Sequence, residues 1–149
     1  MVTLVIEKTK KLYFQECKKE LQDDKLIILL YFIQRNYYAQ YHKLLFDDNF
    51  MFVKDELMIQ KSFGTNELNF DGYKEYSILN TIRLYAMYES WYLLKIAKQD
   101  NGLNNAYLNQ SLLDYELFYE DASKVRVFDV LYDCFLDELE DEVFWDDEQ

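Results

Sequence analysis

The stretch Lys25–Phe52 reads KLIILLYFIQRNYYAQYHKLLFDDNFMF, and its first part decides the fold. Eight consecutive apolar residues, Leu26–Ile33, open it, and apolar side chains continue at steps of three and four to Tyr41. A helix that is apolar nearly all round must be surrounded by other elements. The stretch therefore predicts a central core helix in which Leu30 and Ile33 are fully buried.

After His42 the hydrophobic period changes. The short apolar strings Leu44–Phe46 and Phe50–Val53 flank the polar residues Asp47-Asp48-Asn49. This pattern predicts a small β-hairpin that turns at the acidic residues. Two strands alone are only marginally stable in water, so we expect the hairpin to pack on the helices.

The rest of the chain predicts further helices and no repeat or linker. We expect a mainly α fold, a compact single-domain helical bundle over 1–149 with the small hairpin after its second helix. The expected helices are Thr9–Leu21, the core helix, Asp55–Phe63, Lys74–Ser90, Trp91–Lys98, Asn104–Gln110 and about Ala122–Val143. We expect Leu12, Phe14 and Cys17 to be buried in the first, Asp23 or Asp24 to cap the core helix, and Gly64 to end Asp55–Phe63. In Trp91–Lys98 we expect Ser90 as the N-cap, Trp91, Leu94 and Ala97 on one face, and Gly102 as a left-handed C-cap. Ser111–Tyr119 fits either a helix or a strand.

Composition favours one folded domain. The 149 residues are 50% hydrophobic and 18% aromatic, which is too much packing material for a disordered chain even at a net charge of −12. Cys17 and Cys134 lie far apart and in no metal-type spacing, which indicates two reduced, buried thiols. The N-terminus lacks the order of a signal peptide, and Leu26–Ile33 is much shorter than the roughly 20 apolar residues that cross a bilayer. We expect a soluble protein of the cytoplasm, in a bacterial cell or a phage-infected host.

The negative charge is concentrated at one end of the chain. Residues 114–149 contain fourteen acidic and two basic residues, whereas residues 1–113 contain fourteen of each. Asp133–Gln149 contains nine acidic residues and no basic one. Such a chain is not expected to bind nucleic acid or a membrane directly, but it suits a protein partner with a basic surface.

The expected last helix places acidic side chains where the helix dipole disfavours them. One explanation is a solubilising tail. The other is an acidic face that binds a basic partner, with large aromatic residues as interface anchors. For the second explanation the candidate partner-binding residues are Asp133, Asp137, Glu138, Asp141, Glu142, Phe144 and Trp145.

Catalytic chemistry has no visible basis in the sequence. His42 is the only histidine, no G-x-S-x-G surrounds a serine, and three scattered glycines make no phosphate-binding loop. Cys/His clusters of the zinc type are absent, and Asp137–Glu142 lacks the spacing of a calcium loop. The aromatic residues lack interleaved basic residues for base stacking. We expect no enzyme activity, no cofactor and no metal.

The order of elements resembles the Panacea domain, a SocA-like antitoxin domain of bacteria, phages and mobile elements. The family's K-L-x-K-L-L-Y-F/Y-A-Q helix is matched by Lys25, Leu26, Leu29, Leu30, Tyr31, Phe32 and Gln34. Its L-F-D-E hairpin is matched by Leu45, Phe46, Asp47 and Asp48. Its later aromatic-x-L…A pattern is matched by Trp91, Leu94, Ala97 and Ala106. The match covers about residues 22–110. The family's G-P-V is replaced by Asp55-Glu56-Leu57, its histidine by Lys98 and its second tryptophan by Leu103.

This resemblance implies a non-enzymatic inhibitor or antitoxin that neutralises a partner protein, such as a toxin, by direct binding. An alternative is an acidic nucleic-acid mimic of the anti-CRISPR or anti-restriction type, which would block the basic groove of a nucleic-acid-binding enzyme. A further alternative is a proteolytic adaptor. Self-association into a homo-oligomer is left open.

Overall fold

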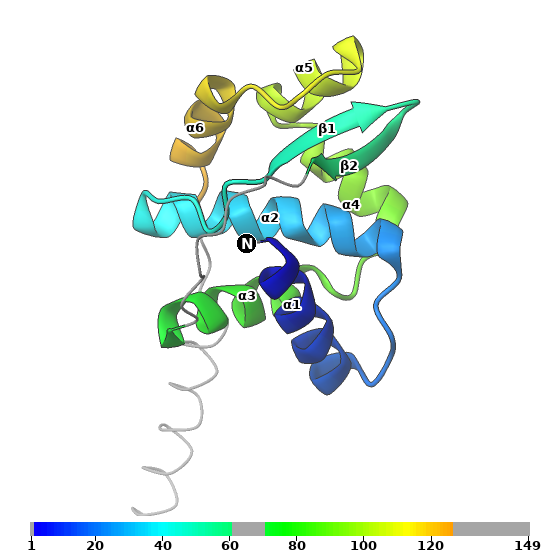
Figure 1. The fold of residues 1–149 in the computed structure, drawn as a ribbon, viewed down its shortest axis with the longest axis vertical. Helices are drawn as coiled ribbons and strands as arrows, with labels where there is room; N and C mark the ends of the chain where they lie inside the picture. Colours follow the sequence, from blue (N-terminus) through cyan, green and yellow to red (C-terminus); the bar gives the residue numbers. More distant parts are fainter. Residues whose placement is uncertain (1, 61–70, 127–149) are drawn as a thin grey trace, which may run out of the picture.

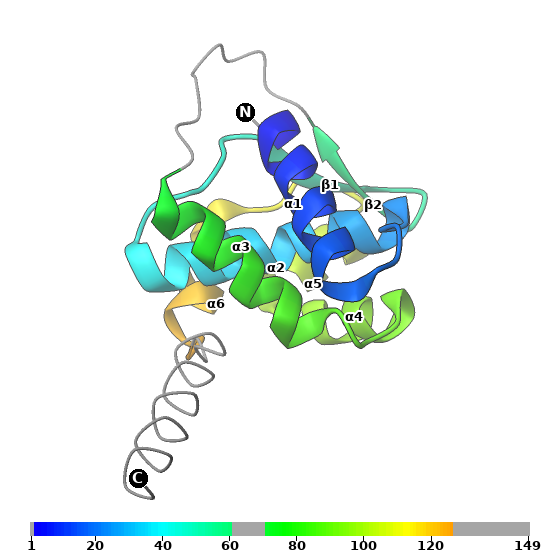
Figure 2. The ribbon, with the colours of Figure 1, turned by 90° about the horizontal axis from the view of Figure 1, so that it is seen from below.

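The predicted core helix is the central element of the fold. In a computed structural model that describes residues 2–60 and 71–126, α2 crosses the middle of the molecule, with α1 and α3 on one side and the hairpin, α5 and α6 on the other (Figure 1, Figure 2). The elements are α1 (Val2–Cys17), α2 (Asp23–Tyr41), β1 (Asn49–Val53), β2 (Glu56–Gln60), α3 (Gly72–Tyr85), α4 (Ser90–Ala97), α5 (Asn101–Asn109) and α6 (Tyr115–Ser123). The described part is therefore mainly helical with a small hairpin after the second helix, as predicted.

Helix α2 is buried as its apolar run requires. Leu30 and Ile33 have no exposed surface, which confirms both predictions. The predicted cap is wrong, because the N-cap residue is Gln22 and it makes no side-chain capping bond. Asp23 and Asp24 instead lie in the first helical turn, where the helix dipole favours acidic residues.

The hairpin is real, but it lies further along the chain than predicted. Strands β1 and β2 pair antiparallel with Val53 opposite Glu56, and the chain turns at Lys54 and Asp55, which have φ angles of 51° and 66°. The predicted strand Leu44–Phe46 and the helix expected to start at Asp55 are both wrong. Type I′ turns usually contain Asn or Gly, and this one contains neither, so the sequence lacked the usual turn signal.

Gln34 explains why the segment before β1 is a loop. Its side-chain amide donates to the Phe46 carbonyl at 2.7 Å, and its Oε1 accepts from the Leu45 amide at 2.8 Å. These bonds use the backbone groups that a strand would need for pairing. A buried side chain on α2 thus fixes the path of the chain into β1.

Residues 111–113 pair with the second edge of β1. The Phe52 amide donates to the Ser111 carbonyl at 3.1 Å, and the Leu113 amide donates to the Phe50 carbonyl at 2.8 Å. The ambiguous segment is therefore extended at its start and helical from Tyr115 onward. Helix α6 ends at Ser123 with Lys124 as its C-cap, so no helix starts at Ala122; the rest of that predicted helix lies outside the described residues.

Gly102 is not the predicted C-cap. It lies inside α5, where its amide donates to Asp121 Oδ2 at 2.7 Å, next to the Asn101 amide, which donates to Asp121 Oδ1 at 3.1 Å. A Cβ atom at Gly102 would lie 3.2 Å from both Asp121 Oδ2 and the Phe118 amide nitrogen. The glycine lets α5 approach α6 closely.

Two predicted buried faces are rotated. Phe14 is 57% exposed while its neighbour Tyr13 is buried, and Trp91 is 65% exposed while Leu93 has no exposed surface. Leu12 and Ala97 are buried as predicted, and Cys17 and Leu94 are half-buried. The contact with the core, not the count of apolar residues, decides which side chains turn inward.

Candidate functional site

The residues predicted to bind a partner lie outside the described part of the chain. Asp133, Asp137, Glu138, Asp141, Glu142, Phe144 and Trp145 all fall in 127–149. The described surface is formed by residues 2–60 and 71–126, and its cavities are the candidate sites.

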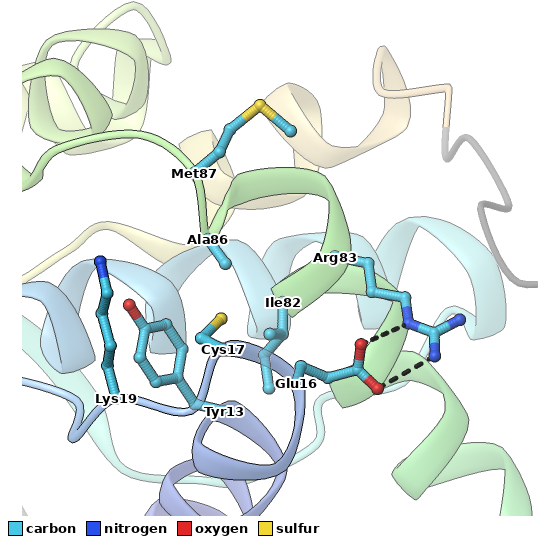
Figure 3. A pocket seen from close by; sticks show the side chains of 8 residues that line it. All are labelled: Tyr13, Glu16, Cys17, Lys19, Ile82, Arg83, Ala86 and Met87. Atoms are coloured by element: carbon cyan, nitrogen blue, oxygen red, sulfur yellow. Dashed lines mark hydrogen bonds and ion pairs between the residues drawn. The ribbon is translucent and has the colours of Figure 1, made fainter.

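One cavity, of about 520 Å³, lies between the end of α1 and the end of α3 (Figure 3). Arg83 crosses its wall and donates two hydrogen bonds to Glu16, at 3.0 and 2.9 Å. This bond to Arg83 is the main cause that lowers the pKa of Glu16. Glu16 and Arg83 therefore pair with each other, and Lys19 is the other charged side chain that lines this cavity.

A second cavity, of about 480 Å³, has the opposite character. It lies where the start of α2, the hairpin turn and the start of α4 meet, on the side of the molecule where Figure 1 shows the blue end of α2 near the hairpin and α4. We call it the acidic groove, and its lining residues are Asp23, Asp24, Ile27, Ile28, Asp55, Glu56, Leu57, Ser90, Trp91 and Leu94.

The rim of the acidic groove has four exposed acidic residues. Asp23 and Asp24 come from α2, and Asp55 and Glu56 come from the hairpin. None of the ion pairs found among the described residues involves any of them. The adjacent Lys25 forms no ion pair with them, since its Nζ donates to the Ala86 carbonyl at 2.6 Å. No ion pair among the described residues therefore offsets the four negative charges of the rim.

The floor of the acidic groove is apolar. Ile28 is buried, while Leu57 and Leu94 are half-buried. Trp91 stands at the edge, and its ring contacts Tyr92 with the ring centroids 5.7 Å apart. Large aromatic side chains beside an apolar floor are typical anchors of protein interfaces.

Sequence reasoning missed the acidic groove. Its walls come from three separate segments, and Trp91 was expected to face the core. Two signals were present in the sequence, the acidic pairs Asp23-Asp24 and Asp55-Glu56, but only the fold brings them to one rim.

A buried polar cluster is formed by Tyr31 and Arg35 of α2 together with Asp100 and Tyr85. Asp100 Oδ2 accepts hydrogen bonds from the Tyr31 hydroxyl and from Arg35 Nη1, and the second bond is 3.1 Å long. Arg35 Nη2 also donates to the Tyr85 hydroxyl at 3.1 Å. Burial, followed by the charge of Asp100, raises the pKa of Tyr31 well above its ordinary value. The polar groups of the cluster therefore bond to one another, and they join α2, α3 and the start of α5.

Other residues that carry the family resemblance also hold the fold. Gln34 fixes the loop before β1, as described above. Asp48 is buried, and its Oδ1 accepts from the Val2 amide at 3.2 Å. Lys25 satisfies the Ala86 carbonyl beyond the last residue of α3.

The described residues offer no metal centre, since no three His, Cys, Asp or Glu side chains among them are grouped to hold an ion. None of the described helices has the length and apolarity that crossing a membrane requires. His42, the only histidine, is exposed at the end of α2 with a left-handed backbone.

Comparisons with protein-family models, with curated proteins and with solved structures found no match to this chain.

Proposed function

We propose that this chain is a non-enzymatic inhibitor of the antitoxin type, which neutralises a partner protein by binding to a basic surface on it. The observation that carries the proposal is the acidic groove, where four carboxylates without an ion-pair partner among the described residues surround an apolar floor and an exposed tryptophan. Opposite charges steer association, and an apolar anchor supplies affinity.

The charge distribution of the sequence supports the same partner chemistry. All of the net charge of −12 belongs to residues 114–149. The proposed resemblance to the Panacea domain favours the same class of function, an inhibitor that acts by contact.

The test begins with affinity capture from the native host and identification of the co-purifying protein, which is then purified. We expect this partner to be basic at the contact surface, to lose its own activity when the chain is added, and to bind more weakly as salt rises. Neutralising Asp137, Glu138, Asp141 and Glu142 to Asn or Gln should slow association and flatten the salt dependence. A partner whose activity is unaffected by saturating amounts of the chain would contradict the proposal.

A second candidate is an acidic mimic of nucleic acid, favoured by the nine acidic residues of 133–149. In that case the partner is a nucleic-acid-binding enzyme, and DNA or RNA should compete with the chain for it. A toxin without a nucleic-acid site would show no such competition. The competition assay therefore separates the two candidates.

A further inference from the structure

The outer edge of β2 presents backbone groups with no described partner. In an antiparallel pair, successive residues direct their N–H and C=O groups alternately to the two sides of the strand. Phe50 and Phe52 bond to Leu113 and Ser111, on the side of β1 that faces away from β2. Their cross-strand partners are Ile59 and Leu57, whose backbone groups therefore point away from β1, to the outer edge of the sheet.

Among the described residues of this edge, strand β2 has no lysine, no proline and no bulge. Edge strands are commonly blunted by lysine, proline or a bulge. Strand β2 reads ELMIQ, pairs with β1 without a register break, and exposes 45% of Met58. It is a regular, largely apolar edge.

The open edge borders the acidic groove. Leu57 belongs to both, and Leu57 and Ile59 are half-buried, whereas Glu56, Met58 and Gln60 are exposed. A strand added beside β2 would follow the same alternation. Every second side chain would therefore point toward the groove floor, and the others would lie beside Glu56 and Met58.

We propose that the acidic groove and the outer edge of β2 together bind an extended basic segment of a partner protein, which adds to the sheet as a third strand. Its main chain pairs with Leu57 and Ile59, and an apolar side chain enters the groove against Trp91. Its lysine or arginine side chains meet the four rim carboxylates. This inference rests on the proposed function and assigns the form of the segment that the site binds.

Charge complementarity and an edge of β2 that no described residue pairs with select this occupant. An acidic segment would be repelled by Asp23, Asp24, Asp55 and Glu56. A helix would leave the outward backbone groups of Leu57 and Ile59 to water, whereas a strand satisfies them. Strand addition obtains affinity from main-chain bonds and specificity from alternate side-chain pockets.

The test uses the full chain and a fluorescent seven-residue peptide of alternating lysine and valine, measured by anisotropy. Each peptide amide is N-methylated in turn, which removes one N–H donor. Strand addition through one edge uses alternate amides, so methylation at every second position should weaken binding by about tenfold and methylation at the others by little.

Protein variants locate the peptide. Trp91→Ala should weaken binding about fivefold or more, whereas Phe14→Ala, which removes a comparably exposed aromatic ring from α1, should not. Neutralising Asp23, Asp24, Asp55 and Glu56 should reduce affinity more than neutralising Asp137, Glu138, Asp141 and Glu142. Circular dichroism verifies that each variant is folded.

Two results would overturn the inference. One is a methylation scan without alternation, and the other is unchanged peptide affinity in both the Trp91→Ala and the rim-neutralised variants. If the captured partner then loses binding only when the C-terminal acidic residues are neutralised, the inference is wrong and the proposed function stands. If no variant changes partner binding and the partner is not inhibited, the proposed function itself is wrong.

Discussion

The two ends of α2 use polar side chains in opposite ways. Toward its C-terminal half, Gln34 and Arg35 are buried, and each polar atom contacts a fixed partner such as Asp100. At its first turn, Asp23 and Asp24 are exposed, and no basic side chain of the described residues pairs with them. Burial makes an unpaired polar group costly, whereas water tolerates it. The first arrangement holds the fold, and the second is free to bind something else.

A second contrast concerns carboxylates in the same small fold. Asp121 caps α5 with two backbone hydrogen bonds, and Asp100 neutralises Arg35. Asp55 and Glu56 line the acidic groove instead. Among the described residues, no buried side-chain nitrogen or oxygen lacks a partner. Asp55 Oδ1 accepts from the Gln110 side-chain amide at 3.1 Å, but neither Asp55 nor Glu56 has an ion-pair partner among the described residues, unlike Asp100.

The largest expected effect comes from the buried ion pair. Arg35→Leu leaves Asp100 without its cationic partner and should lower the free energy of unfolding by about 3–5 kcal/mol. The double variant Arg35→Leu, Asp100→Leu should lose clearly less, because no buried charge is left alone. Urea denaturation followed by circular dichroism measures both. Equal losses in the single and double variants would show that the pair is not what stabilises this end of α2.

A smaller effect depends on pH and concerns Tyr115, whose hydroxyl donates to the Asp48 carbonyl at 3.3 Å. Burial, the largest cause, raises the pKa of Tyr115 to about 12. The folded protein therefore holds this proton more tightly than the unfolded chain, whose tyrosine pKa is about 10. The stability from this group is complete below pH 10, declines as pH rises toward 12, and amounts to at most about 2–3 kcal/mol.

The matching measurement is urea denaturation of wild type and Tyr115→Phe at pH 7, 9.5 and 11. Wild type should be more stable at pH 7, by about 0.5–1.5 kcal/mol for the hydrogen bond, and should lose this advantage at pH 11. Tyr73→Phe, at a side chain that is 69% exposed, is the control. A constant difference between wild type and Tyr115→Phe at all three pH values would contradict the assignment.

The smallest effect on stability is expected at the groove. Asp55→Asn with Glu56→Gln should change the free energy of unfolding by no more than about 0.5 kcal/mol, as is usual for surface sites. Thermal melts at two salt concentrations would measure the change. A loss as large as that of Arg35→Leu would mean that the rim carboxylates serve the fold and would remove the contrast with the interior.

The sequence by itself determined the central helix and the charge distribution. An apolar run such as Leu26–Ile33 has no stable place except inside the protein, so its burial did not depend on the details of its neighbours. The sequence also determined that the segment starting near Lys74 is helical, because its apolar residues recur with the helical period over several turns. Charge is a count of side chains and needs no fold.

Only the tertiary structure decided the hairpin, the role of Gly102 and the acidic groove. Leu44–Phe46 and Leu57–Ile59 have similar strand propensity. The first does not form a strand because the Gln34 side chain hydrogen-bonds to the backbone groups of Leu45 and Phe46. Glycine often ends a helix, which is why the sequence predicts a C-cap at Gly102, but in the structure the close approach of Asp121 from α6 requires the glycine. The groove joins α2, the hairpin and α4, and proximity between such distant segments is a property of packing, which local sequence patterns do not encode.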